Sequence, residues 1–303
     1  MIEPAVILLR LVQYSAASVL MGSALLFVYA LPAQGPAAAA SLRWARPLLV
    51  GAALVLAVGT LLGLALQTET LADELSAGAL TAVVTQMDLG KAAVARAALA
   101  LIAAIYATII PRGRALWLGT GVLGILACAT FGWMGHGAAT DGAGHALHLA
   151  ADIVHALAAA AWIGALVAFA GLAAPRQQRA ERLSALATAL QRFSPIGIGL
   201  VAALAVSGLV NAWYLAGADG GAALRDPYGQ VLALKLVLFA AMLALAALHR
   251  QRSVPALAAW LEADLLPRGD ALASLRRSLL GEAVLGFAVL AVVAWLGTLP
   301  PPA

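Results

Sequence analysis

Eight apolar segments, each about 20 residues long, determine what this chain can fold into. They lie at residues 5–30, 48–66, 92–110, 115–133, 147–172, 195–216, 229–249 and 278–298. A helix of this length crosses a bilayer and makes its backbone hydrogen bonds internally. Only 11% of the residues are charged, whereas soluble domains average about 25%. We therefore expect an all-α, polytopic membrane bundle of eight transmembrane helices.

The distribution of basic residues predicts the orientation of the bundle. Most Lys and Arg follow the first, third, fifth and seventh segments, whereas the opposite loops hold only Lys91 and Arg225. Because cytoplasmic loops are rich in Lys and Arg, both termini and the loop after the fourth segment are expected outside. The net charge of +4 follows from these loops and does not indicate nucleic-acid binding. Cys128 is the single cysteine, which excludes an internal disulfide.

A weak internal repeat runs through the chain. Met21–Phe27 resembles Ile163–Phe169, and Arg96 takes the same place in the third segment as Lys235 in the seventh. Four segments per half is an even number, so the halves would be parallel repeats with the same orientation. Chance similarity is the alternative, because Gly, Ala and Leu dominate both halves.

The repeat divides the chain into an N-terminal four-helix half, residues 1–134, and a C-terminal half, residues 135–303. In this alignment Gln13 takes the place of His155, so that only the second half carries a row of histidines.

The histidine row is the strongest candidate for a functional site. His145, His148, Asp152 and His155 fall within an arc of about 80° on one helix face and extend over about 15 Å. That distance is too long for one ion, but neighbouring pairs such as His148 and Asp152, or Asp152 and His155, suit a metal. Asp152 would bind metal directly or orient a histidine ligand. His136 lies in the preceding loop. Alternatively, these side chains are solvated or pack at the interface, although ionisable groups inside membranes are usually functional.

Sulfur ligands near this row favour copper over zinc. Met134 is close to His136 in the sequence, and Cys128, Met87 and Met21 are secondary candidates. Imidazole with soft sulfur suits copper, although each sulfur residue alone is more often a packing residue. The choice between Cu(I) and Cu(II) stays open.

Three cations lie inside the predicted spans. They are Arg10, Arg96 and Lys235. Each either extends outward to the membrane surface or pairs with a carboxylate. The candidate partners are Asp152, Asp88 and Asp226. Three unneutralised cations near an entrance would repel copper. Glu282, near the inner end of the last predicted span, is a candidate exit ligand or a partner of a neighbouring Arg.

Several motifs in the second half are similar to those of a known family. They are His145 and His148 through His155 leading into Trp162-Ile-Gly, Arg192-Phe-Ser, Ser207-Gly-Leu-Val-Asn-Ala-Trp213, Tyr228-Gly-Gln-Val-Leu-Ala-Leu-Lys235, and Ser278 through Glu282 before a closing Pro-Pro. In their order and spacing they resemble the copper resistance D (CopD/PcoD) family of integral membrane proteins.

The resemblance implies a multi-pass protein of the bacterial inner membrane with periplasmic termini and a role in copper homeostasis. It implies copper transfer from periplasm to cytoplasm, or cooperation with a periplasmic copper carrier protein. The resemblance assigns the metal-facing role to His148, Asp152 and His155, and less directly to His136, His145 and Met134.

Three other functions compete with copper transport. A b-type haem or electron-transfer protein is disfavoured because His148 and His155 share one helix, although a haem between His136 and His155 stays open. The sequence does not distinguish a copper transporter from a scaffold that receives copper without moving it. An enzyme is not expected, since there is no nucleophile–base set and no nucleotide-binding loop. Transport would therefore be passive or ion-coupled.

Overall fold

The computed structural model describes residues 2–30, 42–73, 75–135, 138, 140, 142–174, 180–216, 226–248, 250–251, 255, 259 and 269–300. Within these residues the secondary structure is helical, without a strand, and eight helices are long and apolar enough to cross a membrane. The prediction of an all-α bundle with eight spans is therefore confirmed.

The spanning helices are α1 (Ile2–Ser18) with η1 (Val19–Ser23) and α2 (Ala24–Tyr29), α4 (Ala45–Ala72), α6 (Asp88–Ile109), α7 (Arg114–Ala129) with η2 (Thr130–Met134), α8 (His145–Leu172), α9 (Ala180–Ala216), α11 (Pro227–Leu248) and α13 (Gly269–Leu296). Two short helices lie at one end of the bundle: α5 (Ala77–Gln86) and η4 (Gly142–Gly144).

The sixth span is longer than its apolar stretch indicates. The predicted start at residue 195 is wrong, because α9 begins at Ala180 and continues through Pro195. Leu183 and Leu186 in the added segment are buried, so packing against neighbouring helices extends the helix beyond the apolar stretch. Proline in a helix interior normally removes a hydrogen bond and bends the helix, yet α9 continues through exposed Pro195 without ending there.

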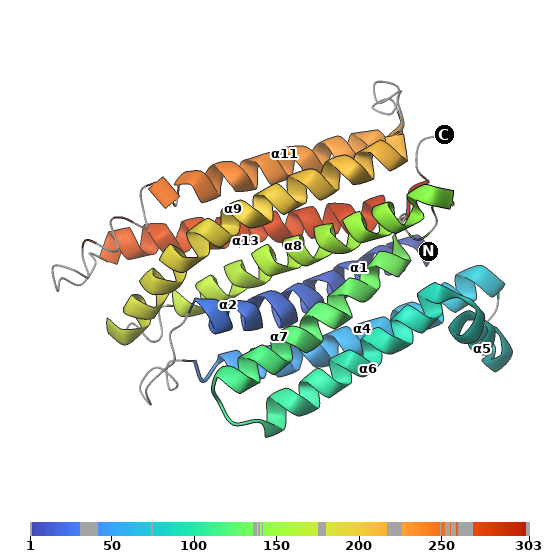
Figure 1. Ribbon diagram of the computed structural model, residues 1–303, viewed down its shortest axis with the longest axis horizontal. Helices are drawn as coiled ribbons and strands as arrows, with labels where there is room; N and C mark the ends of the chain where they lie inside the picture. Colours follow the sequence, from blue (N-terminus) through green and yellow to red (C-terminus); the bar gives the residue numbers. More distant parts are fainter. Residues whose placement is uncertain are drawn as a thin grey trace.

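Helices α1 and α8 form the centre of the bundle (Figure 1). Helices α4, α6 and α7 lie on one side of this pair and α9, α11 and α13 on the other. Helix α1 packs against α4 and α8, α8 packs against α9 and α13, and α6 packs against both α4 and α7. The two central helices therefore join the two groups.

The close approach of α1 to α8 depends on two glycines. A Cβ atom on Gly164 would lie 2.1 Å from the Ser18 carbonyl oxygen and 2.6 Å from the Gly22 Cα. The Ser23 hydroxyl also donates a hydrogen bond of 2.7 Å to the Gly164 carbonyl oxygen. Small residues allow membrane helices to approach at backbone distance. Gly22 and Gly164 are aligned with each other in the repeat described above, and their mutual contact is what a two-fold relation between parallel halves would produce.

Candidate metal site

The first three turns of α8 carry the histidine row, and His148 is its most buried member. Its side chain is 1% exposed. The Nδ1 atom is 2.7 Å from the Thr140 hydroxyl, and the ring stacks on Tyr214 with 4.7 Å between ring centroids. The Nε2 atom is buried and has no hydrogen-bond partner. Two neighbours therefore fix the ring, while one nitrogen remains available.

Asp152 lies one helical turn after His148 and is held from α9. The Asn211 amide donates a hydrogen bond of 2.7 Å to Asp152 Oδ1. The other carboxylate oxygen lies against the backbone of Gly135, where an added Cβ would be 2.8 Å from it. Opposite charges also attract Asp152 and Lys235, one of the pairings that the sequence suggested.

His155 uses both of its ring nitrogens. Nδ1 is 3.0 Å from the Ser207 hydroxyl, which itself donates to the Ala203 carbonyl oxygen at 2.6 Å. Because that hydroxyl proton is used, Nδ1 is assigned as the N–H that donates to Ser207. The Nε2 lone pair then faces the Lys235 ammonium at 3.5 Å. His155 is thus less available to a metal than His148.

The remaining histidines are close to the start of α8. His145 Nδ1 is 3.0 Å from the Thr140 carbonyl oxygen, so Thr140 contacts two histidines, one through its main chain and one through its side chain. His136 lies outside the described residues. In the part of the chain that the structure describes, no three His, Cys, Asp or Glu side chains converge on one point as a metal cluster.

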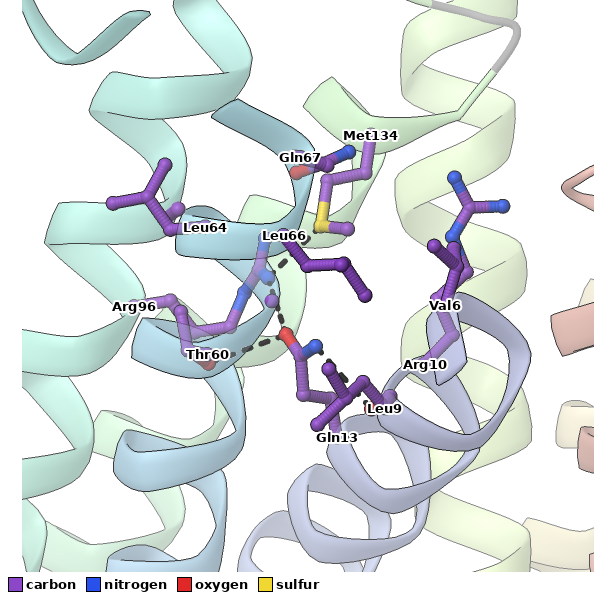
Figure 2. Close-up of a pocket in the computed structure, with 12 residues that line it drawn as sticks. Val6, Leu9, Arg10, Gln13, Thr60, Leu64, Leu66, Gln67, Arg96 and Met134 are labelled. Carbon is purple, nitrogen blue, oxygen red and sulfur yellow. Dashed lines mark hydrogen bonds between the residues drawn. The ribbon is translucent and has the colours of Figure 1, made fainter. Parts of the chain in front are cut away.

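Met134 faces away from the histidine row and toward the N-terminal half. Its sulfur accepts a hydrogen bond of 2.9 Å from Arg96 Nη1 (Figure 2). The reason is local: Thr130–Met134 forms a 3-10 turn, which winds more tightly than the preceding α-helix and changes the direction of the side chains.

Arg96 is fully buried and is held by neutral groups. Its guanidinium donates to the Thr130 hydroxyl at 2.8 Å, to the Thr130 carbonyl at 3.1 Å and to Gln13 Oε1 at 3.1 Å, and it lies 3.9 Å from the Phe131 ring centroid. Asp88, one of the suggested partners, instead pairs with Lys91 at 2.9 Å. Among its described contacts, Arg96 has no carboxylate.

Gln13 and His155 have equivalent surroundings. Gln13 on α1 contacts Arg96 and accepts a hydrogen bond of 3.3 Å from the Thr60 hydroxyl. His155 on α8 likewise lies between a cation and a hydroxyl, with Nε2 at 3.5 Å from Lys235 Nζ and Nδ1 donating to Ser207. Gln13 thus lies between a cation of α6 and a hydroxyl of α4, and His155 between a cation of α11 and a hydroxyl of α9.

The secondary candidates are dispersed through the bundle. Cys128 is buried near the Ala156 carbonyl oxygen, at 3.8 Å, and Met21 is buried beside Gly124. Met87 is exposed between α5 and α6. Cys128 thus contacts the main chain of α8 one residue after His155, whereas Met21 and Met87 lie elsewhere in the bundle.

Glu282 lies deeper than expected. Because α13 begins at Gly269, Glu282 is near the middle of the helix and is 3% exposed. It accepts a hydrogen bond of 3.0 Å from Trp162 Nε1 on α8. Arg10, on α1, places its guanidinium beside Gly297, which directly follows α13 and where an added Cβ would be 2.5 Å away.

Several residues of these polar centres were not among the predicted site residues. Thr140 and Tyr214 hold His148, and Gln13 bonds to Arg96. The alignment of Gln13 with His155 was a usable signal for Gln13. Thr140 lies in the loop before α8, and Tyr214 follows the Ser207–Trp213 motif in the sixth apolar segment; neither carried a signal that linked it to His148.

Comparisons with known proteins agree with this architecture. Residues 1–146 match the family model for the Copper resistance protein D-like, N-terminal domain, and residues 187–296 match that for Copper resistance protein D. The chain is 33% identical over 315 residues to Copper resistance protein D of Pseudomonas syringae pv. tomato, covering 99% of this chain and 97% of that protein. It is 29% identical over 151 residues to Copper transport protein CutJ of Bacillus subtilis (strain 168), covering 50% of this chain and 25% of that protein. No solved structure matches the chain. The chain therefore belongs to the copper resistance protein D family of multi-pass membrane proteins.

Proposed function

We propose that the protein binds copper at the periplasmic end of α8 and moves it across the bacterial inner membrane to the cytoplasm. The observation that carries the proposal is the state of His148. Its Nε2 atom is buried without a partner, whereas Nδ1 and the ring face are held by Thr140 and Tyr214. Histidines that bind metals have this arrangement, with the second nitrogen fixed by a hydrogen bond. A buried nitrogen without a partner is otherwise unfavourable.

The proposed ligands differ in how much must change before they bind copper. His148 and Asp152 are separated by one turn and are already oriented, so we assign them the first contact. His155 joins when Lys235 withdraws from its Nε2 atom. His145 and His136 extend the row outward, and Met134 would have to leave Arg96 to take part.

The path across the membrane continues along α8. Glu282 is buried near mid-membrane beside Trp162 of the same helix that carries the row, and we assign it the next anionic contact for a cation moving inward. We also propose that residues 1–134 and 135–303 are parallel halves that pivot at the contact of Gly22 with Gly164. A periplasmic copper carrier protein is the proposed donor. One relative carries the name Copper transport protein, which supports transport over binding alone.

Copper affinity of purified variants tests the site. Competition with a chromophoric Cu(I) chelator is expected to show that His148→Gln and Asp152→Asn each weaken binding at least about tenfold. His249→Gln and Asp226→Asn are matched controls, since His249 is a histidine outside the row in the sequence and Asp226 is an exposed acid. Wild-type affinity in His148→Gln would rule out the proposed site.

Transport is tested separately in proteoliposomes loaded with a Cu(I) indicator. Copper supplied to the outer face is expected to reach the lumen with the wild-type protein and to stay at background with His148→Gln. If wild-type protein binds copper but the lumen signal stays at background, the protein is a copper-receiving scaffold. A reduced-minus-oxidised visible spectrum with haem bands would favour the electron-transfer alternative.

A further inference from the structure

A small cavity in the N-terminal half lies between α1, α4, α6 and η2 (Figure 2). Its volume is about 20 Å³, enough for one water molecule or a single ion of similar size. The lining residues with polar or sulfur groups are Arg10, Gln13, Thr60, Gln67, Arg96 and Met134. It is separate from the row on α8, although it is near the same end of the bundle.

The cavity carries positive charge without a matching acid. Two of its lining residues are arginines and none is Asp or Glu. Arg96 is 0% exposed, and its described partners are hydroxyl, carbonyl, amide and thioether groups and an aromatic ring. A cation buried inside a membrane protein is costly unless a counter-charge compensates it. Neutral acceptors and the Phe131 ring reduce that cost but leave the charge.

Hydrogen-bond donors remain free on both arginines. A guanidinium has five N–H groups. In Arg96, Nε donates once, Nη1 donates twice and Nη2 donates once, which leaves one N–H on Nη2. Arg10 Nε is buried and has no partner. The cavity therefore lacks an acceptor, and a water molecule would supply one without supplying charge.

We propose that this cavity binds one monatomic anion of the chloride class, which accepts hydrogen bonds from Arg96 and Arg10. The small volume disfavours a tetrahedral oxyanion with its four oxygens. A bound anion also lowers the positive potential at this end of the bundle, where an arriving copper ion would otherwise meet Arg10, Arg96 and Lys235. The proposal does not depend on copper transport, because the unbalanced charge and donors are present in the protein itself.

The test measures thermal stability of the purified full-length protein in a zwitterionic detergent. Sodium chloride and sodium bromide are titrated against sodium gluconate at constant ionic strength. A saturable rise in Tm is expected with both halides and not with gluconate, since a ligand that binds only the folded state stabilises it. Arg10→Gln is expected to weaken the halide response about 10- to 100-fold, as loss of a charged hydrogen bond predicts. Lys91→Gln, which removes an exposed cation paired with Asp88, should keep the wild-type response.

Bromide anomalous scattering from crystals of the wild-type protein provides a second measurement that does not depend on a variant folding. A bromide peak in the cavity beside the free Nη2 N–H of Arg96 is expected. Equal stabilisation by all three salts, or an unchanged response in Arg10→Gln, would overturn the proposal. So would a response that requires added phosphatidylglycerol and is absent with halide, because the acceptor would then be a lipid phosphate.

Discussion

Replacement of Gly164 by alanine tests whether the contact between α1 and α8 holds the bundle together. The added Cβ would lie 2.1 Å from the Ser18 carbonyl oxygen and 2.6 Å from the Gly22 Cα, both backbone atoms that cannot rotate away. Ordinary contact begins at 3.4 Å, so the helices must separate by more than about 1 Å. Separation also weakens the hydrogen bond from Ser23 to the Gly164 carbonyl.

The expected loss of stability follows from these two effects. Overpacking a close interface costs about 1–3 kcal/mol, and a hydrogen bond between membrane helices contributes about 0.6 kcal/mol. Together they predict a loss of about 2–4 kcal/mol for Gly164→Ala. Gly22→Ala meets the same backbone from the other side and should cost a similar amount. The double variant should lose less than the sum, because once the helices have separated the second methyl group is accommodated.

Reversible unfolding in mixed micelles with increasing dodecyl sulfate measures this difference. Gly51→Ala is the matched control, since the same methyl group on α4 meets nothing within 4 Å. It should leave stability unchanged or raise it slightly, because alanine favours a helix more than glycine does. If Gly164→Ala unfolds at the same denaturant concentration as Gly51→Ala, the inference of a tight glycine contact is refuted.

Two further predictions concern the histidine row and the acid below it. Thr140→Val removes the hydroxyl that holds His148 Nδ1, and Cu(I) affinity measured by chelator competition should fall about 10- to 100-fold with little change in Tm; unchanged affinity would mean that the hydrogen bond does not orient the ring. Trp162→Phe removes a donor to the buried Glu282 carboxylate and should cost about 1–3 kcal/mol of stability. That variant should also slow copper uptake into proteoliposomes while leaving copper affinity intact, and equal losses of both would contradict the assignment of Glu282 to a later step.

The eight spans were predictable because hydropathy and backbone hydrogen bonding leave a membrane chain few alternatives. The ends of the spans were less predictable. Helix α9 continues through Pro195 because Leu183 and Leu186 are buried by neighbouring helices, which local sequence does not reveal.

The candidate site was predictable where it depends on one helix and not where it depends on several. Helical periodicity placed His148, Asp152 and His155 on one face of α8, and the structure gives each of them a partner from another segment. The direction of Met134 was not predictable, since a 3-10 turn and a contact with Arg96 on another helix determine it. Only the alignment of Gln13 with His155 in the repeat indicated that Gln13 would contact a cation.

The π-helical turn at Val19–Ser23 has a consequence for the length of the first span. A π turn accommodates one residue more than an α-helix, and one residue corresponds to a rotation of about 100°. Deletion of one residue from this turn would convert it to regular α-helix. Helix α1, which precedes the turn, would then rotate about the helix axis. Gln13 would then leave Arg96, although Phe27 beyond the turn would stay against Trp44 and Trp117. A single extra residue thus sets the angular register between the two ends of the helix.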